Sequence, residues 1–302
     1  MPNKRVIHHQ SVHGALALRS NYPIICATIL LLLLIPAWAD TLTLADGSQV
    51  PDIGKLPPVE TNPDNPPTEA RIALCRALFF DNRISASGTM NCASCHLPHQ
   101  GWTVQTPLSP ANPGWVERRN SPTLINVGYN KALIWDGRAW PLEKQALGST
   151  KNPVHKGQDL TKLMAVLNED PVMLEMFDKA YGNKPNPTDY GKSLAVFQRH
   201  VIITGPSRFD RYMEGDKTAL DDAAIRGMQI FKSKGNCIAC HNGPNFTDSG
   251  FHNVGLKPPP MLDDAAHQKI LQFDAKRTKT PDWQKITTDP GRYLITHKPA
   301  DW

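Results

Sequence analysis

Residues 78–96 read LFFDNRISASGTMNCASCH and end in the pentapeptide Cys92-Ala93-Ser94-Cys95-His96. The same pattern returns as Cys237-Ile238-Ala239-Cys240-His241. A Cys-x-x-Cys-His run is typical of c-type haem attachment, in which the thiols form thioethers with the haem and the histidine takes the proximal iron position. Zinc sites or disulfides are the alternatives, but zinc needs four protein ligands at one point, and disulfides leave both histidines without a role. We therefore predict two covalently bound haems, held by Cys92, Cys95, His96, Cys237, Cys240 and His241.

The first 39 residues have the order of a secretory signal peptide. Lys4, Arg5 and Arg19 precede the apolar run 24–35, and small residues on either side of Trp38 follow it. This order predicts export with cleavage before Asp40, and hence a periplasmic protein. The apolar run is short for a bilayer span. An uncleaved N-terminal anchor is the alternative, because the basic leader is long.

The charge bears on nucleic-acid binding, and the cysteine count bears on which thiol is left over. Residues 1–39 contain three basic residues and no acidic one, so the formal charge falls from +5 to +2 when they are removed. A chain this close to neutral gives no support to nucleic-acid binding. Of the six cysteines, Cys26 leaves with the leader, four belong to the two motifs and Cys75 remains alone. Cys75 lies in the apolar stripe of a predicted helix, so we expect a buried, inert thiol.

Helical patterns dominate the chain after the leader. Thr68 is a predicted N-cap, and Cys75 and Phe79 then recur at helical spacing on one face. Pro171 stands at the favoured first position of a later helix, and Gly182 is a predicted C-cap for it. No alternation typical of strands is sustained anywhere.

The segments between these helices are long and rich in proline. Residues 50–67 are too proline-rich for a helix or a central strand, and residues 97–120 form a long loop that we expect to line a site. The sequence thus predicts a mainly α, loop-rich fold with two cytochrome c-like haem domains. The leader occupies residues 1–39, the first haem domain residues 40–205 and the second, incomplete one residues 206–302, with the boundary near Pro206.

The order of motifs resembles the bacterial di-haem cytochrome c peroxidases and their relative MauG, which oxidises tryptophans in a partner protein. The resemblance covers most of the mature chain and is specific to the family rather than to one member. The matching pieces are the two Cys-x-x-Cys-His motifs together with Leu78-Phe79-Phe80-Asp81, Ser85 to Gly88, Arg119-Asn120-Ser121-Pro122-Thr123, Trp135-Asp136-Gly137-Arg138, Glu143 to Gly148, Phe209-Asp210-Arg211-Tyr212 and Phe246-Thr247-Asp248.

This resemblance implies roles for single residues. The haem on His96 would be the peroxidatic one, and the haem on His241 would accept and deliver electrons. Trp135 matches a tryptophan that conducts electrons between the haems, and Gln145 matches a glutamine beside the peroxide-binding haem. Asn120 matches a ligand of a calcium ion between the domains. For Trp135, Gln145 and Asn120 the alternatives are a core aromatic, a helix polar residue and a turn former.

Two departures from the family concern the peroxidatic haem. Pro113-Gly114-Trp115 stands where many members have His-Gly-Trp, and proline cannot ligate iron, so we expect an open or water-ligated iron without reductive activation. His155 stands where the family has a glutamate. A histidine with a pKa near neutrality could move the protons of peroxide cleavage. It could also close the iron site, or be a surface residue.

The third departure is the C-terminus. The chain stops at Trp302, whereas the family continues into a segment that carries the second axial ligand of the electron-transfer haem. We therefore expect a chain that is truncated relative to its family. The candidates for a substitute ligand are Met261, His252, His267 and His297.

These features predict a periplasmic di-haem peroxidase that reduces hydrogen peroxide. His155 would move its protons, Gln145 would orient it, and electrons from a small cytochrome c or copper protein would pass through Trp135. The alternatives are MauG-like oxidation of a partner protein, a non-catalytic di-haem electron-transfer cytochrome and an incomplete product of a peroxidase gene. The resemblance leaves a homodimer open.

Overall fold

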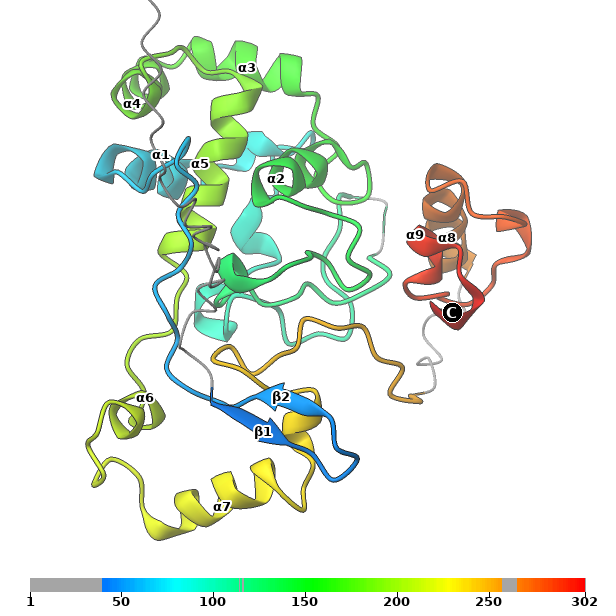
Figure 1. Ribbon diagram of the computed structural model, residues 1–302. Coiled ribbons are helices and arrows are strands. Elements are labelled where there is room, and N and C mark those ends of the chain that lie inside the picture. Colours follow the sequence, from blue (N-terminus) through cyan, green and yellow to red (C-terminus); the bar gives the residue numbers. More distant parts are fainter. Residues whose placement is uncertain (1–39, 114, 116, 257–264, 302) are drawn as a thin grey trace, which may run out of the picture. The chain divides into compact units, whose positions relative to one another are not determined.

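A computed structural model describes residues 40–113, 115, 117–256 and 265–301 (Figure 1). The predicted signal peptide and Met261 lie outside these residues. The mainly α, loop-rich class is confirmed. The helices are α1 (Glu69–Phe79), α2 (Leu142–Lys151), α3 (Leu160–Asn168), α4 (Pro171–Tyr181), α5 (Pro187–His200), α6 (Arg208–Met213), α7 (Asp222–Lys232), α8 (Ala265–Arg277) and α9 (Tyr293–Thr296).

One small antiparallel hairpin was not predicted. Its strands are β1 (Thr41–Thr43) and β2 (Gln49–Pro51), and Leu42 pairs with Val50. Strands of three residues are too short to show an alternating pattern, which is why the sequence does not reveal them. Pro51 ends β2, a place in a sheet that proline tolerates.

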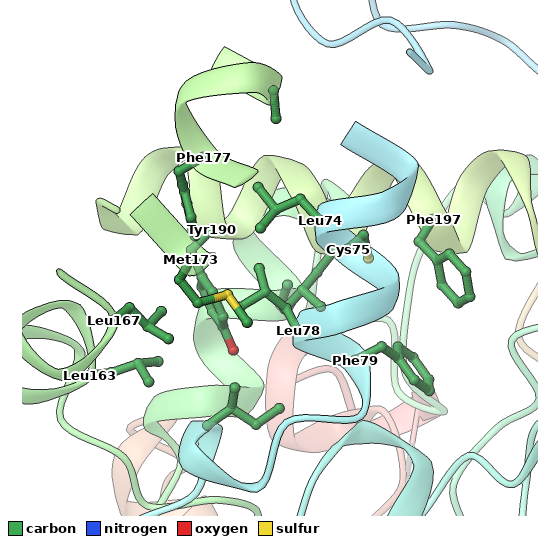
Figure 2. Packing of buried hydrophobic residues seen from close by; sticks show 14 of the residues in the cluster. Leu74, Cys75, Leu78, Phe79, Leu163, Leu167, Met173, Phe177, Tyr190 and Phe197 are labelled. Carbon is green, nitrogen blue, oxygen red and sulfur yellow. The ribbon is translucent and has the colours of Figure 1, made fainter. Parts of the chain in front are cut away.

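The main hydrophobic core lies between α1, α3, α4 and α5. Figure 2 shows Leu74 and Leu78 on one side of α1, facing Met173 and Phe177 of α4 and Tyr190 of α5. All but Met173 are at most 1% exposed, and Met173 is 6% exposed. The rest of the cluster includes Cys75, Phe79, Leu163, Leu167, Leu194 and Phe197.

The predicted helix ends are confirmed. The Thr68 hydroxyl accepts a hydrogen bond from the backbone N–H of Arg71 and so caps α1. Pro171 opens α4 behind the N-cap Asp170, and Gly182 closes it with a φ of 67°, a left-handed conformation that glycine adopts without strain. Cys75 is fully buried, and burial raises the pKa of its thiol well above the ordinary value, as expected of an inert cysteine.

An aromatic cluster ties the loop after the first motif to this core. Trp102 makes edge-to-face contacts with Phe79 of α1 and Phe197 of α5, at ring-centroid distances of 5.7 and 5.9 Å. Such contacts add specific geometry to apolar burial. They fix the position of the Trp102 backbone, and this backbone contacts the histidine of the first motif.

The C-terminal helices have a small core of their own, built on Leu271, Ala275, Ile286 and Leu294. The predicted boundary between two haem domains near Pro206 stays a prediction. Among the described residues, no helix has the length and apolar composition that crossing a membrane requires.

Candidate functional site

The two Cys-x-x-Cys-His motifs have the same local geometry. Cys92–Ser94 and Cys237–Ala239 each form one turn of 3₁₀ helix. The backbone N–H of the histidine donates to the carbonyl of the first cysteine, at 3.0 Å for His96 and 2.9 Å for His241. The two cysteines and the histidine of each motif therefore follow one another within a single turn of backbone.

Both histidines are oriented by a backbone carbonyl. Nδ1 of His96 lies 3.0 Å from the carbonyl oxygen of Trp102, and Nδ1 of His241 lies 3.2 Å from that of Phe246. A histidine that donates through Nδ1 leaves Nε2 unprotonated and ready to bind a metal. Burial lowers the pKa of His96 to about 4, which keeps the ring neutral, the form that ligates iron.

A cavity of about 350 Å³ opens beside the first motif, and Cys92, Cys95 and His96 line it. This volume lies within the usual range for cofactor sites. Much of the remaining lining is apolar, as the faces of a haem require: Phe79, Met90, Leu124, Val127, Leu133 and Leu142. The thiols, the oriented imidazole and the apolar walls fit a haem at this place.

The three residues predicted to act on peroxide line the same cavity. Trp135, Gln145 and His155 come from separate segments and meet there, together with Asn120, the predicted calcium ligand. Cys237, Cys240 and His241 do not line it. The structure thus brings the predicted residues of the first haem together, and their individual roles stay predictions.

Trp135 and Asn120 are joined to each other. Nε1 of Trp135 donates to the backbone carbonyl of Asn120 at 2.7 Å, while Trp135 as a residue is 57% exposed. The Asn120 amide braces its own loop: Oδ1 accepts from Thr103, and Nδ2 donates to the carbonyls of Val104 and Thr106. Because the side-chain oxygen already has a partner, calcium binding by Asn120 stays a prediction.

Gln145 is placed by the packing of α2 on α5. A Cβ at Gly191 of α5 would lie 2.9 Å from the carbonyl oxygen of Glu143, so only glycine allows this close approach. Arg199 of α5 pairs with the Glu143 carboxylate at 3.1 Å and fixes the same contact. Together these contacts hold the helix that carries Gln145 at the cavity.

The pKa expected for His155 is wrong. Burial and the positive charges of Lys156 and Arg138 lower the pKa of His155 to about 3, so the ring is neutral at working pH. The sequence shows the residue type and not its surroundings, which is why a value near neutrality was expected. Nε2 of His155 lies 3.5 Å from Oε1 of Glu117, a second cavity residue that the sequence analysis missed.

The sequence offers one weak signal for Glu117, which is its charge pattern. Residues 97–116 contain no Asp, Glu, Lys or Arg, and Glu117, Arg118 and Arg119 then follow directly before the family motif at Asn120. Three charges at the end of an uncharged loop draw attention to this segment, although they do not show which of the three faces the site. Pro113, in the same loop, is exposed and has no group that could ligate iron.

The second motif is more open than the first. Cys237 and His241 are exposed. Of the described candidates for a further ligand, His252 lies beside the motif: its ring, the Asp248 carboxylate and the Cys240 sulfur have ligand atoms within 4.8 Å of one another. His252 Nε2 pairs with Asp248 at 2.8 Å. His267 is buried in α8, and His297 follows α9.

A buried ion-pair network joins this part of the chain to the C-terminal helices. Arg118 pairs with Asp136, Asp274 and Asp289 at 3.1, 2.9 and 3.1 Å, and Arg119 pairs with Asp136 and Asp289. Burial by itself would raise the pKa of Asp289, but the hydrogen bond from Arg119 and the charge of Arg118 lower it to about 2. The arginines also hold the pKa values of Asp136 and Asp274 below the ordinary range.

We expect this network to make stability depend on acid. Because its pKa is depressed, Asp289 contributes to the free energy of unfolding. This contribution is fully present above the ordinary pKa of 3.8 and is lost as the pH falls toward 2. Its share is about 2 kcal/mol. The free energy of unfolding, measured between pH 5 and pH 2, should therefore fall over this window. The fall should be smaller in Asp289→Asn, and an equal fall in that variant would contradict the assignment.

A mainly α fold with two such motifs and a cavity fitted to haem is typical of a di-haem protein. The family model for di-haem cytochrome c peroxidase matches residues 69–218. A cytochrome-c peroxidase named IdrP1 from Pseudomonas sp. (strain SCT) is 34% identical over 270 residues, which are 88% of this chain and 71% of that one. The chain belongs to the di-haem cytochrome c peroxidase family and is a peroxidase-type oxidoreductase with haem as its cofactor.

Two further likenesses agree with this. The methylamine utilization protein MauG of Methylophilus methylotrophus is 34% identical over 233 residues, covering 76% of this chain and 69% of that one. The crystal structure of a MauG-like protein associated with microbial copper homeostasis is similar with a TM-score of 0.65 at 25% identity, over 82% of this chain and 70% of that one. The cytochrome c-like character of the haem domains is consistent with these neighbours.

Proposed function

We propose that this chain is an exported, periplasmic peroxidase that carries two covalently attached c-type haems and reduces hydrogen peroxide at the His96 haem. Its electrons come from a small cytochrome c or copper protein and enter at the His241 haem. The cavity beside the first motif carries the proposal, because Cys92, Cys95 and His96 share it with Gln145 and Trp135. The signal-like order of residues 1–39 supports export.

The protein's own residues would divide the work at this cavity. Haem bound there supplies an iron that exchanges single electrons and breaks the O–O bond of peroxide. The Gln145 amide can donate and accept hydrogen bonds and so orient peroxide. The His155 ring can exchange a proton with it, and the exposed indole of Trp135 lies on the cavity wall as an electron conduit. Asn120 keeps its proposed role as a calcium ligand.

Oxidation of a partner protein is the second candidate. Relatives named MauG from two organisms are 34% and 35% identical to this chain, and Pro113 leaves the first iron without the histidine that many peroxidases use. Nothing in the described residues identifies such a partner. A homodimer also stays open.

The first test is spectroscopic. The haem-loaded mature protein is examined by absorption and electron paramagnetic resonance before and after one equivalent of peroxide, and turnover is then measured with a reduced cytochrome c or copper protein. A high-spin ferric signal that peroxide abolishes, together with turnover, supports the proposal. Two low-spin signals that peroxide leaves unchanged would indicate a non-catalytic electron carrier.

A further inference from the structure

Glu117 lines the cavity, and the two arginines that follow it in the sequence pair with other carboxylates. Its side chain is 15% exposed, and among the described residues the titratable group that it contacts is the neutral His155 ring, with Nε2 at 3.5 Å from Oε1. The adjacent Arg118 and Arg119 turn to Asp136, Asp274 and Asp289 instead. Burying a carboxylate that no cation pairs with directly is costly, so Glu117 lacks the direct ion pair that usually stabilises a buried carboxylate.

The two facing groups differ in the charge they can hold. Burial and the nearby negative charge of Asp274 raise the pKa of Glu117 to about 7, so this carboxyl gains or loses a proton near neutrality. His155 stays neutral down to a pKa of about 3. The ring can therefore accept a proton at one nitrogen while it releases the proton of the other nitrogen. It does not remain positively charged. The carboxyl can keep the proton.

We propose that Glu117 and His155 form the proton relay of the peroxide site, with His155 transferring the proton and Glu117 storing it. The proposal rests on the proposed function and deepens it, since it assigns the acid–base work to a pair of which one member is new. Glu117 acts through His155: it is a positioning and proton-storing residue, and His155 is the group that meets peroxide.

The relay moves one proton within a balanced reaction, in which hydrogen peroxide, two electrons and two protons give two waters. A proton leaves one peroxide oxygen for one ring nitrogen of His155, while the proton on Nε2 passes to the Glu117 carboxylate. The reverse transfer delivers the proton to the other oxygen as the O–O bond breaks, and this oxygen leaves as water. The remaining oxygen becomes the second water with two electrons from the redox partner and two protons from solvent.

Charged groups from several elements set the proton affinity of the pair. Asp274 of α8 raises the pKa of Glu117, whereas three cations oppose it: Arg138, Arg118 and Lys156. The same lysine and Arg138, with Arg277 of α8, disfavour a charged His155, and Asp274 favours it. Burial, together with these cations, therefore disfavours a positively charged imidazole, and the pair operates through the carboxyl.

Removing the carboxyl tests the relay in the haem-loaded full chain. The wild-type kcat/KM for peroxide should rise with pH through about 7, because Glu117 must be ionised to accept a proton. Glu117→Gln should lower kcat/KM by about 10²–10⁴-fold, the usual contribution of general acid–base catalysis, and abolish this rise. Glu117→Asp, which keeps a carboxyl, should be slower and retain the rise.

Asp189→Asn is the matched control. It removes the carboxylate of a residue that is 5% exposed and does not line the cavity, and the asparagine oxygen can still accept from Asn183 and Asn186. Its kcat/KM and pH profile should equal those of the wild type. A loss in this variant as large as in Glu117→Gln would show that any buried carboxylate matters equally, and would overturn the proposal.

A second readout does not depend on turnover. The infrared difference spectrum of the haem-loaded protein between pH 6 and pH 8 should contain a protonated-carboxyl band that disappears at the higher pH. This band should be missing in Glu117→Gln and present in Asp189→Asn. An active wild type together with a Glu117→Gln variant that keeps its rate, its pH profile or the band overturns the relay alone. A haem-loaded wild type that does not reduce peroxide at any pH overturns the proposed function, and the relay with it.

Discussion

A Cys92→Ala/Cys95→Ala double variant is expected to carry one covalent haem per chain instead of two and to lose peroxide reduction. Both thiols line the first cavity with His96, and each would form a thioether bond to the haem. Without these bonds a haem would be held by His96 and apolar contacts alone. The second motif, which does not line this cavity, should keep its haem. Intact-protein mass and haem staining after denaturation measure the count directly.

The corresponding Cys237→Ala/Cys240→Ala variant is the control for this result. It should also carry one covalent haem, but it should keep the response of the first site to peroxide, because that cavity is intact. What it should lose is steady-state turnover with a reduced redox protein, since electrons would enter at the His241 haem. If the two double variants behaved alike in the response to peroxide, the division of labour between the motifs would be wrong.

Features that depend on neighbours in the chain could be predicted from the sequence. Thr68, Pro171 and Gly182 act through hydrogen bonds and dihedral angles within one helical turn. Each haem motif is likewise a single turn with its histidine oriented by a carbonyl five or six residues away. The family resemblance added the distant members of the site, and the structure brings Trp135, Gln145 and His155 to one cavity.

Features that depend on burial and on contacts between distant parts of the chain could not be predicted from the sequence. Glu117 and His155 are separated by 38 positions in the sequence, and neither the short distance between them nor the pKa of His155 follows from residue type. The partners of Arg118 in the C-terminal region are 156 and 171 residues away. No local pattern indicates which of the chain's acidic residues would reach an arginine at such a separation.

Arg118→Ala is expected to lower the free energy of unfolding by about 3–5 kcal/mol, the usual cost of removing one partner of a buried charge pair. The guanidinium is 4% exposed and faces three carboxylates that are themselves 0–15% exposed. Removing it leaves Asp274 with the half-exposed Arg277 as its remaining ion-pair partner. Denaturant unfolding at pH 7, followed by circular dichroism, measures the loss. Arg76→Ala, at an exposed position of α1, should change stability by less than about 0.5 kcal/mol.

The effect of Arg118→Ala should extend from stability to the cavity. Asp274 of α8 lines the cavity and contributes to the pKa of Glu117, so an Asp274 that has lost its main cation should raise that pKa further. The pH at which kcat/KM rises should then move upward in Arg118→Ala. High salt should restore little of the lost stability, because buried pairs are weakly screened. Two results would contradict this role: a loss of unfolding free energy in Arg118→Ala that is as small as in Arg76→Ala, or a loss that disappears at high salt. Either would show that the network is a surface cluster and does not hold the C-terminal helices against the site.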